Sequence, residues 1–326
     1  MENTNVAVHT GIELLMTVQA ASDWRHQGLC QQPYPYRDAA FALADRFSEH
    51  PACQQARALL ADGFSYDAPV AFVLCHGAPP SLEQQAPYDP HYVLERAGPG
   101  GVGGLVAFAA ALRDFVRRTD FAGFLRAWEP FHAQVRAQAL SSIDPAWTAR
   151  LAAYSGMAPA STHICVAPLS RQGFGYGPTI AAPSGPVHVT VAGPAWVDEG
   201  MPRFDARDFW KPVVIHEGAH GFVNPTMDAQ GDTLAASAAS LEPIAATISP
   251  AYGVWQAAAA EHVVRAVAAR LSDDPDRALA QEEKWGFRYV RAVAAALEEY
   301  EAQRDRYPRF ADFGPRLAQV FADLCK

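Results

Sequence analysis

Thirteen residues, Val213 to Pro225, restrict the fold and the chemistry of this chain more than any other stretch. They read VVIHEGAHGFVNP, and the apolar residues around the polar ones predict a helix. On a helix, His216 and His220 project from one face about one turn apart, which is the spacing of a metal-chelating pair. Glu217 follows the first histidine and is expected beside the metal, close enough to take a proton from a metal-bound water.

The flanking residues predict where this helix begins and ends and how deeply it is buried. Asp208 is expected to cap it, Pro212 fits its first turn, and Pro225 is expected to close it after about four turns. The helix is too apolar for a surface position, so its histidines and its glutamate are polar groups in a core or at a cleft. Two core histidines bonded to carbonyls, with Glu217 paired to an arginine, are the alternative, but a zinc ion accounts for all three groups together.

A catalytic zinc usually has three protein ligands and an open position for water, so a third ligand is expected downstream of His220. On the predicted helix Trp255 to Leu271, Glu261 lies on an apolar stripe with Arg265 one turn later. This position favours Glu261 as the third ligand, with Glu242 in reserve, and an ordinary Glu261–Arg265 ion pair is the alternative. In the ligand interpretation, Arg265 orients Glu261. The other downstream candidates are Asp228, Asp232 and His262.

A family resemblance is visible in the order of these motifs. HE-x-x-H followed by a phenylalanine, then VNP, the aromatic–glycine pair in PAYGVW, and E-x-x-x-R on a helix resemble an uncharacterised bacterial family of predicted gluzincin metallopeptidases, catalogued only as a domain of unknown function. The resemblance covers nearly the whole chain. It implies a zinc ion on His216, His220 and Glu261 with Glu217 as general base, and it implies no substrate. Gly218 departs from this pattern, because a bulkier residue is expected after the glutamate.

The remaining sequence predicts an α+β fold that is mostly helical, in which a small sheet precedes the HE-x-x-H helix of a zincin-like core. A capping box, Thr10 to Glu13, is expected to start the first helix. β-rich runs occupy Thr162 to Gly193, and helices then continue to the end, with a break at Tyr307-Pro308. We expect a helical N-terminal region, 1–158, and a catalytic region, 159–326, in one two-lobed unit. The N-terminal helices are expected at 10–21, 36–49, 51–61, 70–75, 102–117, 120–139 and 144–156.

The strand Val187 to Val191, VHVTV, is expected to be the edge strand that lines the substrate cleft. Its alternation predicts buried valines and exposed His188 and Thr190. An extended peptide could add to such an edge through main-chain hydrogen bonds, whereas an ordinary hairpin strand is the alternative. Tyr252 is the first candidate for stabilising an oxyanion, followed by Tyr176 and His188, although such residues more often serve packing. The residues expected to support the ligands or to line the substrate edge are Arg265, Asn224, His188 and Tyr176.

Charge and cysteine content restrict the expected partners and compartment. The chain has 26 basic and 35 acidic residues, a formal net charge of −9, and no basic run, which argues against nucleic-acid and anionic membrane partners. Neither a secretory leader nor a stretch of about eighteen apolar residues is visible, so we expect a cytoplasmic protein. The 5 cysteines are scattered and predict reduced, mostly buried thiols.

These observations predict a zinc-dependent metallohydrolase with one zinc ion per chain. The metal lowers the pKa of its bound water from about 15.7 towards about 7, and Glu217 accepts the proton as the hydroxide attacks a polarised carbonyl. The expected activity is that of a metallopeptidase on a peptide or protein substrate. A zinc-dependent amidase of a small metabolite and a non-catalytic zincin-fold binding or scaffold protein are the alternatives.

Overall fold

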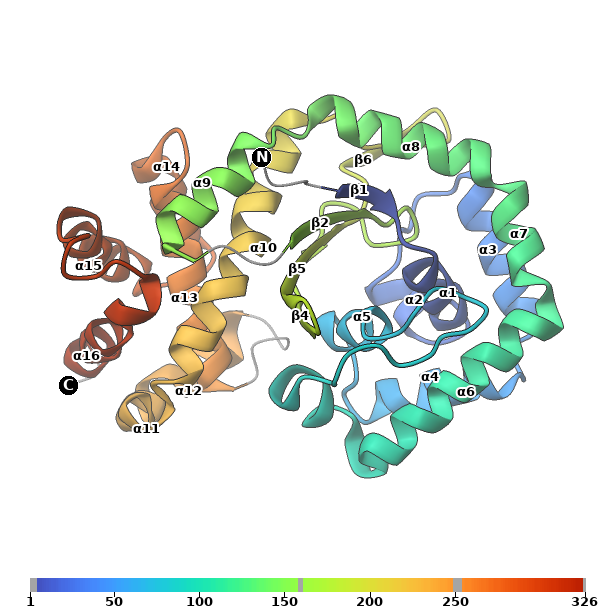
Figure 1. Cartoon of the computed structure of the whole chain (residues 1–326), viewed down its shortest axis with the longest axis horizontal. Helices are drawn as coiled ribbons and strands as arrows, with labels where there is room; N and C mark the ends of the chain where they lie inside the picture. Colours follow the sequence, from blue (N-terminus) through green and yellow to red (C-terminus); the bar gives the residue numbers. More distant parts are fainter. Residues whose placement is uncertain (1–4, 158–160, 249–253, 325–326) are drawn as a thin grey trace. The chain divides into compact units, whose positions relative to one another are not determined.

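A computed structural model describes residues 5–157, 161–248 and 254–324, which form two compact units (Figure 1). Unit 1 consists of Met1–Asp144 and Pro159–Lys211, and unit 2 of Pro145–Ala158 and Pro212–Lys326. Each unit has its own hydrophobic core. This division differs from the expected boundary after residue 158, because the β-rich segment belongs with the N-terminal helices.

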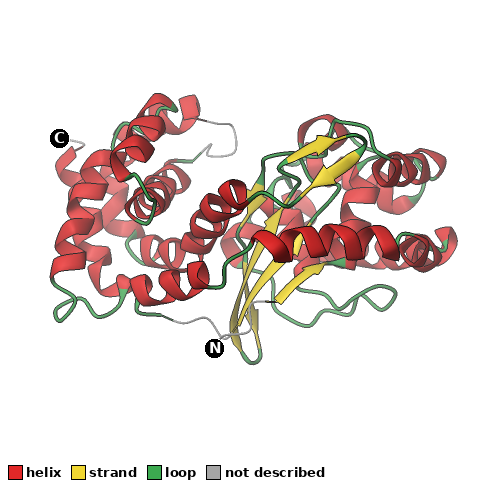
Figure 2. Ribbon diagram, turned by 90° about the horizontal axis from the view of Figure 1, so that it is seen from above, coloured by secondary structure: helices red, strands yellow, loops and turns green. Residues whose placement is uncertain are grey.

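A mixed sheet organises unit 1, where Figure 2 shows the strands in yellow. The strand order is β1-β2-β5-β3, β4 also pairs with β5, and the β1–β2 and β2–β5 pairs are parallel. The first strand was not predicted, and it ties the start of the chain to the β-rich segment. The sheet strands are β1 (Asn5–Val8), β2 (Ser161–Val166), β3 (Gly175–Tyr176), β4 (Thr179–Ala182) and β5 (Gly185–Ala192), and β6 (Trp196–Asp198) and β7 (Met201–Arg203) form a separate hairpin.

The strand expected at the sheet edge lies inside the sheet. β5 pairs with β2 along one side and with β3 and β4 along the other, so its main-chain groups are engaged on both sides. Both of its faces are also covered, because His188 is 5% and Thr190 1% exposed although the alternation predicted that they face solvent. Peptide addition at β5 was therefore a wrong prediction.

Helices make up most of unit 1, and in Figure 1 α6, α7 and α8 form an arc around the rest of it. α1 packs against α3, α4, α5 and α6, and α8 packs against β1 and β2. One helix expected at 120–139 is two, because Pro130 in the first turn of α8 removes a helical N–H and its ring clashes with the preceding turn. The helices are α1 (Thr10–Gln19), α2 (Trp24–Gln27), α3 (Pro35–Arg46), α4 (Pro51–Ala61), α5 (Asp67–Leu74), the π-helix η1 (Pro90–Leu94), the 3-10 helix η2 (Gly98–Gly100), α6 (Gly101–Thr119), α7 (Phe121–Ala127) and α8 (Glu129–Ser142).

The start of α1 also differs from the predicted capping box. His9 is the N-cap, and its Nδ1 accepts the backbone N–H of Ile12 at 3.3 Å. Glu13 is instead completely buried and accepts a hydrogen bond from the hydroxyl of Tyr36 at 2.6 Å. The glutamate lies in the first turn of α1, but its side chain belongs to the core and does not cap the helix.

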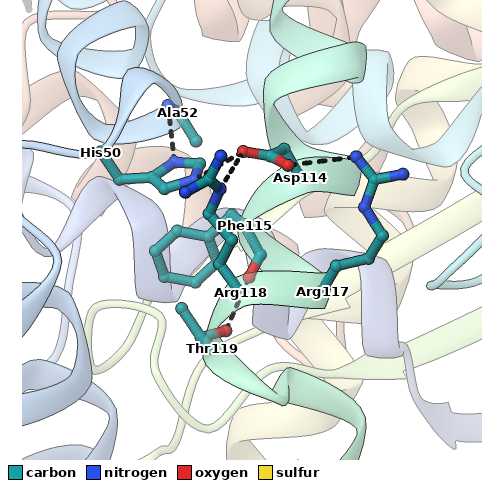
Figure 3. Close-up of polar contacts among 7 residues, drawn as sticks. All are labelled: His50, Ala52, Asp114, Phe115, Arg117, Arg118 and Thr119. Carbon is teal, nitrogen blue, oxygen red and sulfur yellow. Dashed lines mark hydrogen bonds and ion pairs between the residues drawn. The ribbon is translucent and has the colours of Figure 1, made fainter.

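A polar cluster joins α4 to α6 (Figure 3). The ring of His50 accepts the backbone N–H of Ala52 at Nδ1, 3.1 Å away, so its Nε2 carries the proton and donates to Asp114 at 3.2 Å. Arg117 and Arg118 donate to the same carboxylate at 3.0 and 2.8 Å. The ring of His50 therefore caps α4 with one nitrogen and contacts α6 with the other.

One helix in the described residues, Gly98–Thr119, is long and apolar enough to cross a membrane by length and composition, where the sequence analysis expected none. Its side chains Leu105, Phe108 and Leu112 are buried in the core of unit 1. Core helices of globular units pass the same test, so this finding is weak evidence for a membrane span.

Four cysteines are free and buried, as the sequence analysis predicted, and Cys325 lies outside the described residues. Burial is the main cause that raises the pKa of Cys53 to about 11 and the pKa of Cys75 and Cys165 to about 12. Burial also raises the pKa of Cys30. These thiols are protonated at neutral pH, which disfavours a nucleophilic role.

Within its described residues, every element of unit 2 is helical. α13 packs against α12, α14 and α15, which surround its long apolar surface. The elements are α9 (Ala146–Ser155), α10 (Arg207–Asp228, whose first residues belong to unit 1), α11 (Gly231–Leu234), the 3-10 helix η3 (Ala235–Ser237), α12 (Ala238–Ile248), α13 (Trp255–Arg270), α14 (Pro275–Lys284), α15 (Val290–Ala302), the 3-10 helix η5 (Phe310–Phe313) and α16 (Gly314–Leu324).

The HE-x-x-H helix, α10, is longer than predicted, with 22 residues. It begins at Arg207, so Asp208 lies in its first turn and does not cap it. Pro225 lies inside the helix, and its carbonyl accepts the backbone N–H of Ala229 at 3.2 Å. The proline removes only one backbone hydrogen bond, and buried side chains on both sides of it, among them Phe222, Val223 and Met227, hold the helix together.

Candidate metal centre

Two helices of unit 2 bring the predicted metal ligands together. α10 presents His216, Glu217 and His220, whose potential ligand atoms all lie within 4.8 Å of one another. α13 presents Glu261, whose Oε1 lies 3.5 Å from Nε2 of His216 and whose Oε2 lies 3.5 Å from Nε2 of His220. The carboxylate therefore faces both imidazoles, although 41 positions or more separate it from them in sequence.

These distances fit a zinc ion between the side chains. A tetrahedral zinc binds histidine nitrogen and carboxylate oxygen at about 2.0–2.2 Å, which places neighbouring ligand atoms about 3.3–3.6 Å apart. A direct hydrogen bond between a charged imidazole and a carboxylate would be about 2.7–2.9 Å long. The two separations of 3.5 Å, each to a different oxygen of Glu261, lie in the range of the first arrangement and exceed the second.

The site is largely removed from water. Glu261 is 2% and Glu217 9% exposed, while the side chains of His216 and His220 are 22% and 20% exposed. The pKa of His216 is lowered to about 3, mainly by burial, and the charge of Glu261 opposes this shift only in part. The imidazole is thus neutral at physiological pH, which is the form that binds a metal.

Asn224, expected to support the ligands or to line the substrate edge, lies beside one of the histidines. Its side-chain oxygen, Oδ1, lies 3.2 Å from Nδ1 of His220, so the ring donates its proton there. The lone pair of the other nitrogen, Nε2, then points towards Glu261. A hydrogen bond on the far nitrogen is the usual way in which a metal-binding histidine is oriented.

Arg265 connects Glu261 to a residue that the sequence analysis missed, Glu282 of α14. Its Nε donates to Oε1 of Glu261 at 2.7 Å and its Nη1 to Oε2 of Glu282 at 2.5 Å. The ion pair Glu261–Arg265, offered as the alternative to metal binding, is therefore present together with the contacts to both histidines. No sequence signal marks Glu282, because it is one acidic residue among several on a polar helix, 17 positions after Arg265.

The glycine after the general-base candidate has a packing explanation. A Cβ atom built on Gly218 would lie 2.4 Å from Cδ1 of Leu151, a buried residue of α9. α9 thus crosses α10 so closely at this position that a larger residue would displace Leu151. The departure at Gly218 removes no ligand and allows this contact.

The other described candidates have surroundings of their own. Glu242, the reserve ligand, is exposed on α12, and Asp228 and Asp232 are exposed too. His262 is fully buried, with Nδ1 2.7 Å from the carbonyl of Ala258 and its ring against Phe287. Tyr252 lies outside the described residues. Tyr176 and His188 belong to unit 1, where both are buried and Nδ1 of His188 lies 3.2 Å from the hydroxyl of Thr179.

Comparison with known proteins gives a family and no function. No curated protein and no solved structure matches the chain. The model of one family, described as a domain of unknown function, DUF4932, matches residues 31–320. The match includes all four residues of the candidate centre and nearly the whole of both units, so the chain belongs to the DUF4932 family.

Proposed function

We propose that this protein is a zinc-dependent metallohydrolase, most simply a gluzincin-type metallopeptidase. His216, His220 and Glu261 would bind the zinc ion, and Glu217 would act as general base. The observation that carries this proposal is the pair of 3.5 Å separations between the carboxylate of Glu261 and the two imidazoles. These are the separations of atoms that share a cation, and they join two helices that are distant in sequence.

The donor set favours zinc over other common metals. Two imidazole nitrogens and one carboxylate oxygen are a typical zinc set, whereas magnesium and calcium take mostly oxygen ligands. Three protein ligands also leave one position of a tetrahedral ion open, which is the pattern of catalytic and not of structural zinc sites. This supports a hydrolase over a scaffold.

Glu217 is placed to move protons in this site. When bound, the zinc ion acidifies water and polarises a substrate carbonyl. Glu217 follows His216 directly on α10, is 9% exposed, and has its carboxylate within 4.8 Å of the potential ligand atoms of both histidines. It would accept the proton of the attacking water and pass it to the leaving amine, while Asn224 and Arg265 hold His220 and Glu261 in place.

Metal analysis tests the site. Purified protein should contain about one zinc ion per chain after reconstitution and dialysis, and His216→Ala and His220→Ala should each abolish binding because two ligands seldom hold zinc tightly. His91→Ala, which removes a histidine of unit 1 whose side chain is 61% exposed, is the matched control and should bind as the wild type does. Wild-type protein that takes up no zinc at neutral pH would overturn the proposal.

A peptide-library screen of the zinc-loaded protein, with and without a chelator, tests the activity. On any peptide that the wild type cleaves, Glu217→Gln should lower the rate by roughly a hundredfold or more, the usual scale for a general base, and should keep the zinc. Chelator-sensitive cleavage that survives this substitution would exclude the role assigned to Glu217. A zinc-loaded wild type that cleaves no peptide would favour the small-molecule amidase or the scaffold.

A further inference from the structure

The guanidinium of Arg265 is held from two sides. On its own helix it donates to Glu261, one turn earlier. On the other side it contacts the carboxylate of Glu282 on α14 and the ring of Phe287, which follows α14 in the chain. The centre of the guanidinium lies 4.0 Å from the centroid of the Phe287 ring. Only 15% of the Arg265 side chain and 17% of the Glu282 side chain are exposed.

Contacts from outside α13 make the Arg265–Glu261 pair better ordered than an isolated ion pair on one helix. An isolated ion pair one turn apart on a helix is worth only about 0.3–0.5 kcal/mol, because two long side chains must be ordered to form it. Glu282 and Phe287 order the guanidinium independently of Glu261. Because the guanidinium is planar and rigid, this also fixes the direction in which its Nε–H group donates. The carboxylate of Glu261 consequently meets a fixed donor on Oε1.

The orientation of that carboxylate determines the geometry of the centre. Its two oxygens each lie 3.5 Å from a different imidazole, so a rotation of the carboxylate would move one oxygen away from its histidine. The hydrogen bond from Arg265 restrains this rotation. Partners of metal ligands commonly contribute about 10- to 100-fold to metal affinity in this way.

We propose that Glu282 is a positioning residue of the metal centre, which fixes the carboxylate of Glu261 through Arg265 and so sets the affinity and geometry with which the site binds zinc. This inference rests on the proposed zinc site. It extends that site to a third helix, α14, which supplies no ligand. The ordering of Arg265 by α14 is thereby part of the function and not only of the packing of unit 2.

The chain contains a matched control on the same helix. Arg270, also on α13, donates through Nε to Glu301 at 3.1 Å and through Nη1 to Glu298 at 2.7 Å, both on α15. This second fork has the same chemistry, but among the ion pairs of the described residues none joins Glu298 or Glu301 to His216 or His220. Glu301→Gln therefore measures what the loss of such a fork does to α13 in general.

The experiment compares Glu282→Gln with Glu301→Gln in the full chain. Zinc affinity is measured by competition with a chromophoric chelator, and the visible spectrum of the cobalt(II)-loaded protein reports the coordination geometry. We expect Glu282→Gln to weaken zinc binding about tenfold or more and to change the cobalt spectrum, and Glu301→Gln to leave both as in the wild type. Glu282→Asp, which keeps the charge but withdraws it by one methylene, should give an intermediate loss.

Each other outcome has a defined meaning. Wild-type affinity together with a wild-type cobalt spectrum in Glu282→Gln would overturn the positioning role and leave the proposed zinc site intact. Equal losses in Glu282→Gln and Glu301→Gln would also overturn it, since the effect would then be a general weakening of α13. Wild-type protein that binds neither zinc nor cobalt would overturn the zinc site and this inference together. The unfolding midpoints of the metal-free variants, measured in parallel, separate a folding defect from a change at the metal.

Discussion

At the residue scale, the carboxylate of Glu261 serves two kinds of partner at once. One oxygen accepts from Arg265 at 2.7 Å, and the two oxygens face the two imidazoles at 3.5 Å. From the sequence alone, the Arg265 ion pair and metal binding are competing interpretations of Glu261. The geometry makes them compatible, because each carboxylate oxygen has two lone pairs.

A pair of conservative substitutions tests Glu261 as the third ligand. Glu261→Gln should weaken zinc binding by several orders of magnitude, because a neutral amide replaces the one anionic ligand of the site. Glu242→Gln should leave the affinity unchanged, because Glu242 is exposed on α12. Competition titrations with zinc would show the difference, and a larger loss in Glu242→Gln than in Glu261→Gln would mean that the ligand assignment is wrong.

What could be predicted at this scale follows from how far apart the residues lie in sequence. Helical spacing alone indicates which residues of α10 act together, because these lie on one face of the helix or next to it: His216, Glu217, His220 and Asn224. Glu261 was recognisable because a carboxylate on an apolar stripe needs a partner. Glu282 was not recognisable, since its contact with Arg265 depends on how α14 packs against α13, which no local pattern encodes.

At the element scale, packing overrode two local signals. Pro225 predicted the end of α10, but the helix continues to Asp228 because its buried side chains stabilise it more than one lost hydrogen bond weakens it. The alternation of β5 predicted one exposed face, but both are covered. Strand β1, with only 4 residues, carries too little pattern to be recognised, and its partner β2 comes more than 150 residues later.

The crossing of α9 and α10 at Gly218 gives a prediction for stability. Alanine is better than glycine in a helix by about 1 kcal/mol, but the added Cβ would come within 2.4 Å of Leu151. Leu151 is 7% exposed, so its Cδ1 would have to shift within the core, and we expect Gly218→Ala to cost about 1–3 kcal/mol overall.

The sign of this effect should depend on the neighbour. With Leu151→Ala in the background, the same Gly218→Ala change should become neutral or stabilising by up to about 1 kcal/mol, because the obstacle is gone. Urea unfolding of the four proteins in this double-mutant cycle provides the coupling free energy. Additive effects of the two substitutions would show that the contact does not restrict residue 218.

At the scale of the whole molecule, the chain passes between the two units repeatedly. Residues 145–158 belong to unit 2 although the segments on both sides of them belong to unit 1. The sequence predicts one boundary after residue 158, where the composition changes from helical to β-rich. Composition cannot show that the β-rich segment pairs with residues 5–8. It therefore could not predict that each unit is built from two separate segments of the chain.

Since each unit has its own core, the two should respond to different conditions. The proposed zinc ligands all belong to unit 2, whereas Glu13, a carboxylic acid with a strongly raised pKa, belongs to unit 1. Burial, its largest cause, raises the pKa of Glu13 from 4.5 to about 8, and the hydrogen bond from Tyr36 lowers it only in part. Glu13 is thus largely protonated in the folded protein at neutral pH.

The stability that this shift contributes has a definite dependence on pH. The folded state holds the proton more tightly than the unfolded chain, so the contribution is complete below pH 4.5 and is lost as the pH rises through about 8. The contribution of Glu13 to the free energy of unfolding of unit 1 should therefore fall between pH 5 and pH 8, by an amount on the order of a few kcal/mol. Glu13→Gln, which has a similar shape and no proton to lose, should remove this slope and be the more stable protein at pH 8.

Urea unfolding at pH 5 and pH 8, with hydrogen-exchange pulses at one fixed pH, would follow the peptides of each unit separately. Glu13→Gln should change the pH response of α1 and α3, which carry Glu13 and Tyr36, and a chelator should act instead on α10 and α13. An unchanged slope in Glu13→Gln would show that another group is responsible. A chelator effect that reaches α1 to the same extent as α13 would show that the two cores unfold as one cooperative system, in which zinc bound to unit 2 also stabilises unit 1.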